Sequence, residues 1–422
     1  MRSPQPSPNP LVASAAKTLI LLILVSSLVG FAGVRLSASL QGTDFVDFYA
    51  AARMLAEGHA HQLYDAHLQR KYQARDASRV GTLYIHPPFE AAIYLAVAWL
   101  PLKSAYLLWS VLSLGFLALG ARLLAKDPRP PWDWRISFAV SLTFVPVLLC
   151  LVQGQDSLLL LLLIVFAFTS LRRGHGFPAG CWLALGLFKF QIILPLTLVL
   201  ALTQEKTARS ALLKGFGLVT LALAILSAAI SGWSVFVVYP SFLLHLREQP
   251  FAGVFPQAMA NFRGLSYLIF PGHRSGWTVA AMATLFGLAL AKTLSDWKRA
   301  SIVFRSDASQ SDSDSRPEFD AAFAGTVMFA LLVSYHLNPH DLSLLLLPIS
   351  LLMRSVWRQT QRPRPLANWL ILSLLAILFL PPLHLYALQA HSYAWISVPL
   401  LLLFLTNGHA ARQDQALAAT RK

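Results

Sequence analysis

Long apolar runs separated by short polar segments dominate this chain. The first run covers Lys17–Leu36, and ten further runs lie at about 104–125, 136–152, 155–171, 177–203, 214–231, 276–295, 319–335, 341–353, 366–382 and 392–406. About 20 apolar residues in a helix cross the hydrocarbon core of a bilayer. Each run is expected to be helical, because a segment in lipid can satisfy its backbone polar groups only within itself or in a closed barrel. The pattern predicts an all-α polytopic membrane protein.

Two segments depart from the pattern of simple spans. The 177–203 run is too long for one span and is interrupted by Lys189-Phe190-Gln191, with Pro195 just beyond, so we expect two short helices meeting near Lys189. The run Phe89–Leu100 follows Pro87-Pro88 and is only about half a span, which is typical of a re-entrant or interfacial segment. The pattern then predicts about twelve transmembrane helices, with both chain ends on the same side.

The basic residues indicate the orientation of these helices. With the N-terminus in the cytoplasm, the inside segments contain most of the Lys and Arg, among them Arg122, Lys126, Arg129, Arg135, Arg172, Arg173, Lys206, Arg209, Lys214, Lys298, Arg299, Arg354, Arg358, Arg362 and Arg364. The opposite loops 153–156, 336–341 and 384–391 contain no Lys or Arg. Cytoplasmic loops typically collect such residues. The net charge of +15 therefore reflects membrane topology and does not predict a nucleic-acid partner.

Composition agrees with a single membrane domain. The chain is 56% hydrophobic and 13% charged, whereas soluble domains carry about 25% charged residues. We expect a cytoplasmic tail at 1–16, one transmembrane domain at 17–406 and a second cytoplasmic tail at 407–422. Within the domain, 37–87 is expected to form a long first outer loop and 232–275 a second outer loop. Residues 17–36 are interpreted as a retained span of a cell-membrane protein, not as a cleaved signal peptide.

Most polar residues near the apolar runs fall on the outer, extracytoplasmic side of this topology. They are Asp44, Asp47, His86, Gln153, Gln155, Asp156, Lys189, Gln191, Arg247, Arg263, His336, Asn338, His340 and Asp341. Ionisable groups at membrane depth are functional candidates by default. Several of them also have a purely structural interpretation. Asp156 could cap the following helix, and Lys189 could extend to the interface from a helix end. Asp47 could be a solvated neighbour of Asp44, and His86 could do no more than shape the turn before two prolines.

Several short motifs occur in collinear order along the chain. They are Gly42–Ala52 (GTDFVDFYAAA), Glu57-Gly58, Leu63–Asp65, Tyr84–Phe89 (YIHPPF), Leu100–Leu102, Leu108-Trp109, Gln153–Asp156 (QGQD), Ala179-Gly180, Gly186–Lys189, Asn261–Gly264 and Ser334–Asp341 (SYHLNPHD). Together they resemble the motifs of GT-C membrane glycosyltransferases of the GT87 type. That family includes polyprenyl-phosphate-mannose-dependent α-mannosyltransferases and related arabinofuranosyltransferases.

The resemblance implies an inverting hexosyltransferase with a GT-C-like fold, a polyprenyl-phosphate sugar donor and a glycolipid or glycan acceptor. Asp44 matches the position of the general base that deprotonates the acceptor. Lys189, Arg263 and His340 are candidates to bind the donor phosphate. Further candidates for substrate binding are His86, Gln155, Asp156 and Asp341, with Asp47 and His336 as secondary candidates.

The resemblance also implies chemistry without a metal ion or cofactor, although Asp44, Asp47 and His86 offer ligand types that a divalent cation could use. No phosphate-binding glycine motif of soluble nucleotide enzymes is present in the sequence. Two other classes stay open: a carrier or flippase for a lipid-linked sugar, and a scaffold without chemistry. A carrier needs polar residues near the bilayer midplane that are reachable from both sides. The predicted gathering of polar residues on one side favours the enzyme.

Overall fold

The computed structural model describes residues 43–77, 81–126, 133–248, 254–270, 276–306, 317–358 and 366–407. All regular secondary structure in this part of the chain is helical, and no strand occurs in it. In chain order the helices are α2 (Phe45–Ala56), η1 (Ala60–Gln62), α3 (Ala66–Asp76), α4 (Pro88–Ile93), α5 (Leu95–Ala98), α6 (Leu102–Leu124), α7 (Trp134–Ser141), α8 (Val145–Gln153), α9 (Ser157–Arg172), α10 (Gly176–Leu185), η2 (Leu187–Lys189), α11 (Phe190–Thr203), α12 (Lys206–Ser231), α13 (Val235–Leu244), η3 (Leu246–Glu248), η4 (Pro256–Ala258), α14 (Phe262–Ile269), α15 (Gly276–Ser306), α16 (Pro317–Val333), η5 (Pro339–Leu345), α17 (Leu346–Arg358), α18 (Leu366–Leu378), α19 (Pro381–Gln389), η6 (Tyr393–Ile396) and α20 (Ser397–Thr406).

Three described helices, α6, α12 and α15, are long and apolar enough to cross a membrane. The number rises to six if each of three bent pairs is counted as one span: α7 with α8 (71°), α10 with α11 (62°) and α18 with α19 (54°). The expectation of about twelve spans is therefore not confirmed. Apolar composition alone does not distinguish a straight span from two short helices that meet at a bend.

The break predicted near Lys189 is confirmed. Helix α10 ends at Leu185, the single turn η2 follows, and α11 begins at Phe190 at an angle of 62° to α10. The segment Phe89–Leu100 forms the two short helices α4 and α5. Their lengths of 6 and 4 residues are far below what a bilayer requires, in agreement with a segment that does not cross.

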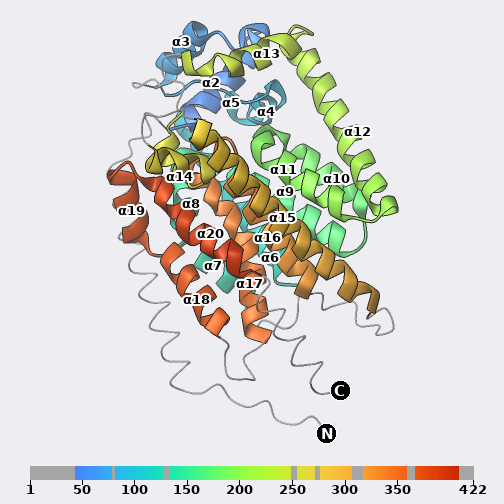
Figure 1. Ribbon diagram of the computed structural model, residues 1–422. Coiled ribbons are helices and arrows are strands. Elements are labelled where there is room, and N and C mark those ends of the chain that lie inside the picture. Colours follow the sequence, from blue (N-terminus) through green and yellow to red (C-terminus); the bar gives the residue numbers. More distant parts are fainter. Residues whose placement is uncertain are drawn as a thin grey trace, which may run out of the picture.

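The expected first outer loop, 37–87, contains more regular structure than the sequence predicted. Its described part holds α2, η1 and α3. These elements lie with α4, α5 and α13 at one end of the helix bundle (Figure 1). The segment 384–391, expected as a loop, is mostly the helix α19. The expected first span at 17–36, the tail 1–16, the tail 407–422 except for Asn407, and parts of the loops 37–87 and 232–275 lie outside the described residues.

The two larger apolar clusters hold the bundle and its end together. The larger one joins side chains of α8, α9, α11, α16, α17 and α20, for example Ile192 and Phe329. The smaller one lies under α2, where Phe48 stacks on Tyr94 with 4.8 Å between ring centroids and an interplanar angle of 3°. Because Phe48 also contacts the ring of His86, this second core positions residues beside the pocket described below.

Helices α10 and α12 pack through glycines. A Cβ atom on Gly180 would lie 2.0 Å from the Leu212 carbonyl oxygen, and one on Gly215 would lie 2.1 Å from the Phe177 carbonyl oxygen. Small residues at such crossings let helix backbones approach closely, which is a common mode of association in membranes. This packing fixes α12 against the α10–α11 pair that carries Lys189.

Candidate active site

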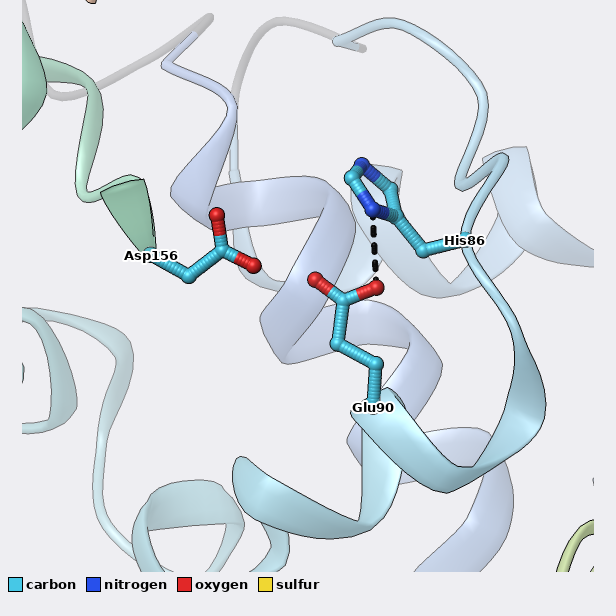
Figure 2. Close-up of side chains that lie close together, drawn as sticks. All are labelled: His86, Glu90 and Asp156. Carbon is cyan, nitrogen blue, oxygen red and sulfur yellow. Dashed lines mark ion pairs between the residues drawn. The ribbon is translucent and has the colours of Figure 1, made fainter. Parts of the chain in front are cut away.

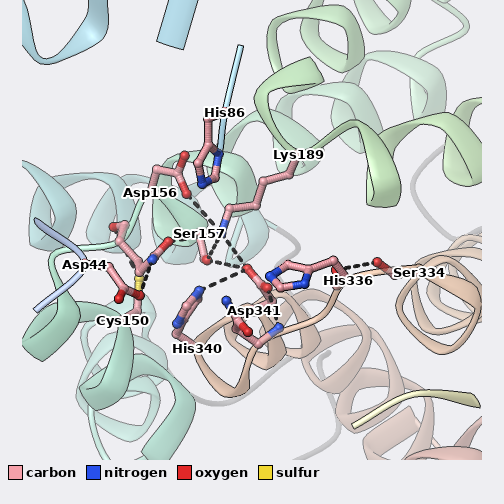
Figure 3. Close-up of polar contacts among 12 residues, drawn as sticks. Asp44, His86, Cys150, Asp156, Ser157, Lys189, Ser334, His336, His340 and Asp341 are labelled. Carbon is pink, nitrogen blue, oxygen red and sulfur yellow. Dashed lines mark hydrogen bonds and ion pairs between the residues drawn. The ribbon is translucent and has the colours of Figure 1, made fainter. Parts of the chain in front are cut away.

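A pocket of about 70 Å³ lies where five segments meet: the start of α2, the loop before α4, the loop between α8 and α9, the bend before α11 and the segment 336–341 at the start of η5. Most of the residues predicted for the site line this pocket. The full lining consists of Asp44, Asp47, Phe48, Thr82, Leu83, Tyr84, Ile85, His86, Gln155, Lys189, Gln191, His336, Asn338, His340 and Asp341. Segments separated by up to about 300 residues thus contribute polar side chains to one cavity (Figure 3).

Asp44 is held at the first turn of α2 by the loop between α8 and α9. Its backbone N–H donates to Gln153 Oε1 at 3.1 Å, and Gln155 Nε2 donates to its carboxylate Oδ2 at 2.6 Å. Although Asp44 is the N-cap of α2, its side chain makes no capping hydrogen bond. Burial raises the pKa of Asp44, whereas the Gln155 hydrogen bond and the Lys189 charge oppose that rise. The carboxylate is therefore available to the pocket.

Gly154 brings the two glutamines close to Asp44. It adopts φ of +66° at the C-terminus of α8, a conformation that glycine accepts without strain. A Cβ atom at this position would also lie 2.6 Å from Phe45 Cβ. Both the turn and the close approach to α2 therefore require glycine.

Lys189 is the centre of a buried ionic network (Figure 3). Its Nζ lies 3.0 Å from Asp156 Oδ1 and 2.5 Å from Asp341 Oδ1, and it donates to Ser157 Oγ at 2.8 Å. A weaker contact of 3.4 Å reaches Gln155 Oε1. With only 2% of the residue exposed, the interpretation of Lys189 as a side chain extending to the interface is wrong.

The two acidic partners of Lys189 are structurally distinct. Asp156 is the N-cap of α9 but makes no side-chain capping bond, so the interpretation of its carboxylate as a helix cap is wrong. It is fully buried and does not line the pocket. Asp341 does line the pocket, and its second oxygen accepts a 2.8 Å hydrogen bond from the Asn338 backbone N–H. Burial alone would raise the pKa of both carboxyl groups, but the charge of Lys189 holds each below its usual value.

Three histidines line the pocket as neutral rings. Burial lowers the pKa of His86 to about 4, that of His336 to about 4 and that of His340 to about 3. At neutral pH each ring therefore offers one N–H donor and one acceptor. For His340, burial thus favours the neutral ring, which donates one hydrogen bond, over the cationic ring.

Asp47 is buried, with 4% of the residue exposed, so it is not a solvated neighbour of Asp44. Its carboxyl group accepts hydrogen bonds from Gln73 Nε2 at 3.0 Å and from Thr82 Oγ1. Burial and the nearby Asp44 charge raise its pKa well above the ordinary value. A Cβ atom on Gly81 would lie 2.3 Å from Asp47 Oδ1. These contacts fasten the 81–87 segment to α2.

Arg263 is not part of the pocket lining. Its Nη1 donates to the Tyr335 carbonyl oxygen at 2.8 Å, and its guanidinium lies 4.0 Å from the centroid of the Tyr335 ring. Arg263 thereby connects α14 to the segment leading into η5. The side chain of Arg247, another candidate on the predicted outer side, lies outside the described atoms.

Glu90 is a residue that sequence reasoning missed. It lies in α4 with none of its surface exposed, and its Oε2 is 2.8 Å from His86 Nδ1 (Figure 2). The sequence contains a signal for a functional Glu90. It is the single charged residue in the apolar segment 87–93, and it follows His86 at a spacing of four.

A second, apolar cavity of about 210 Å³ lies beside the polar pocket. It is lined by residues from α4, α12 and α13 and from the segment before α11: Pro87, Pro88, Phe89, Leu187, Thr220, Leu223, Ala224, Ser227, Val235, Phe236, Tyr239 and Pro240. Pro87 directly follows His86, which lines the polar pocket. An apolar space and a polar site therefore meet at the start of α4.

Comparison with known proteins identifies the family. The sequence model of glycosyltransferase family 87 matches residues 84–381, which include all the pocket residues contributed after Leu83. Asp44 and Asp47 precede the matched region. No curated protein matches the chain significantly. Since the matched region covers well over half of the sequence, this helical membrane protein belongs to glycosyltransferase family 87.

Proposed function

We propose that the protein transfers a hexose, with mannose as the first candidate, from a polyprenyl-phosphate donor to a glycolipid or glycan acceptor. The reaction takes place at the extracytoplasmic face of the cell membrane, and both chain ends are cytoplasmic. The observation that carries this proposal is the carboxylate of Asp44, which Gln155 orients within a pocket that also contains Lys189 and His340.

In the proposed reaction Asp44 is the general base. Gln155 engages Oδ2, so Oδ1 is assigned to the acceptor hydroxyl. The hydroxyl oxygen attacks the anomeric carbon while its proton passes to Asp44. The bond between that carbon and the phosphate oxygen breaks, the electron pair leaves with the lipid phosphate, and the configuration inverts. A raised pKa makes a carboxylate a stronger base, as general-base catalysis near neutral pH favours.

The leaving phosphate needs hydrogen-bond donors and positive potential. Among the three candidates, Lys189 and His340 line the pocket and Arg263 does not. Two carboxylates already share the charge of Lys189, so its positive potential at the phosphate is attenuated. His340 and His336 are assigned as neutral donors to the phosphate oxygens, and Lys189 supplies the remaining positive potential. No metal ion or other cofactor takes part in this step.

The apolar cavity beside the pocket supports a lipid-linked donor. It begins at Pro87 and is bounded by Ala224 and Tyr239 of α12 and α13. The adjacent face of α12 also exposes large apolar side chains, including Leu221 at 59%. An isoprenoid tail can lie along this face while its phosphate reaches the pocket past His86. A soluble nucleotide-sugar would not require such a surface.

The test uses the full chain reconstituted in vesicles with radiolabelled polyprenyl-phosphate mannose and an acceptor glycolipid extract. Asp44→Asn preserves the side-chain shape and removes the base, so transfer should fall by about 10²- to 10⁴-fold. Asp133→Asn, at a solvent-exposed side chain, is the matched control and should behave as wild type. Transfer at the wild-type rate by Asp44→Asn would show that the base is misassigned. Movement of the donor between leaflets without a new glycosidic bond would instead indicate a carrier.

A further inference from the structure

Three side chains of metal-ligand type converge beneath the pocket. They are His86 in the loop before α4, Glu90 in the first turn of α4 and Asp156 at the start of α9 (Figure 2). One potential ligand atom from each lies within 4.8 Å of the other two. The proposed transfer step assigns no role to Glu90 or Asp156.

The two carboxyl groups of this cluster are buried with few polar partners. Glu90 and Asp156 have none of their surface exposed. Glu90 Oε2 lies 2.8 Å from His86 Nδ1, and Asp156 Oδ1 lies 3.0 Å from Lys189 Nζ. The two carboxyl groups also lie within hydrogen-bonding reach of each other. A buried charge is costly unless it is paired and hydrogen-bonded or coordinates a metal.

Positive charge is scarce beside these two acids. Lys189 already contacts two carboxyl groups, those of Asp156 and Asp341. Among the described residues no Lys or Arg forms an ion pair with Glu90, whose contact at this distance is His86. A divalent cation between Glu90 and Asp156 would place positive charge beside both carboxyl groups.

We propose that His86, Glu90 and Asp156 bind one divalent transition-metal ion of the Zn²⁺ or Mn²⁺ type. One imidazole nitrogen with two carboxylate oxygens is a ligand set that suits these ions, whereas Mg²⁺ and Ca²⁺ prefer oxygen alone. The separation of 2.8 Å between His86 Nδ1 and Glu90 Oε2 is close to that of neighbouring ligands on one ion. Bonds of about 2.1 Å have ends about 3 Å apart in an octahedral Mn²⁺ site and about 3.4 Å apart in a tetrahedral Zn²⁺ site.

Because the cluster is buried, the bound ion has a structural role. Glu90 and Asp156 do not line the pocket, so the ion cross-links the loop before α4 to the start of α9 from beneath. It thereby fixes Asp156, which in turn holds Lys189 at the pocket. The ion is a positioning element and does not contact the transferred sugar, so this site and the proposed reaction can fail independently.

The test measures metal content and thermal unfolding of the full chain in detergent, which require no substrate. Protein is equilibrated with Zn²⁺ or Mn²⁺, dialysed exhaustively and analysed by elemental mass spectrometry. We expect about one equivalent of one of these ions per wild-type chain and a lower unfolding temperature after chelation. Glu90→Gln and His86→Asn should each lose the ion. Glu57→Gln, which removes a carboxylate paired with Arg53 and Arg75, should retain it.

The wild-type protein alone suffices to overturn the proposal, even if a variant fails to fold. A content well below one equivalent, together with an unfolding temperature that neither metal nor chelator changes, would mean that Glu90 and Asp156 share a proton. Retention of a full equivalent by both Glu90→Gln and His86→Asn would place the ion elsewhere and also overturn the site.

Discussion

Gln155 donates a 2.6 Å hydrogen bond from Nε2 to Asp44 Oδ2 across a separation of 111 residues. This bond joins a segment that precedes the family match to a loop within it. The same amide accepts a 3.4 Å contact from Lys189 at its Oε1. Gln155 therefore connects the proposed base to the buried ionic network, and its orientation is fixed from both ends.

The first prediction concerns the pH dependence of Gln155→Leu. A general base works when deprotonated, so activity should fall as pH drops through the pKa of Asp44. Burial raises that pKa, and the Gln155 hydrogen bond opposes the rise. Removal of this hydrogen bond should raise the pKa of Asp44 further and shift the acid limb of kcat/KM to higher pH. The measurement is a pH–rate profile of both proteins, and an acid limb that stays in place would argue against Asp44 as the base.

The second prediction separates the two aspartates of α2. Burial and the Asp44 charge raise the pKa of Asp47 well above its ordinary value, and its carboxyl oxygens are engaged by Gln73 and Thr82. Asp47→Asn keeps the shape of the side chain and one accepting oxygen. Transfer should stay within about threefold of wild type, in contrast to the loss expected for Asp44→Asn. Equal losses in both variants, measured in one assay, would contradict the distinct roles.

The sequence was sufficient to predict helices, the break near Lys189 and the short segment after Pro87-Pro88. These features follow from local composition, because lipid imposes helical structure on apolar runs. The number of spans was not predictable in the same way. The bends of 71°, 62° and 54° depend on how each short helix packs against its neighbours, and a hydropathy pattern contains no such information.

The candidate site, too, could be predicted only in part. Asp44 and His340 lie just outside apolar runs, and Lys189 lies at the break within one, which is why their meeting in one pocket could be anticipated. Side-chain direction could not be anticipated. Lys189 turns into a network with Asp156 and Asp341, and Arg263 turns to a backbone carbonyl outside the pocket. Both outcomes depend on partners that are distant in sequence.

The third prediction tests Lys189 as the centre of that network. Lys189→Met leaves Asp156 and Asp341 buried without their cation, and removal of one partner from a buried pair typically costs about 3–5 kcal/mol. The apparent unfolding temperature in detergent should therefore fall markedly. Combination with Asp341→Asn removes one uncompensated charge and should recover part of the loss. A double variant no more stable than Lys189→Met alone would indicate that the ion pair is not the source of the effect.

The last prediction concerns the turn that places Gln153 and Gln155 beside Asp44. Gly154→Ala puts a side chain into the left-handed region, which costs about 1–2 kcal/mol, and its Cβ would lie 2.6 Å from Phe45 Cβ. The start of α2 must then move, and transfer should fall together with stability. Gly217→Ala is the matched control, because a Cβ there meets nothing within 4 Å among the described residues and alanine favours the helix by up to about 1 kcal/mol. The unfolding temperature and the transfer rate of both variants are measured in parallel. If Gly154→Ala changes them no more than Gly217→Ala does, the approach of Gly154 to α2 does not position Asp44.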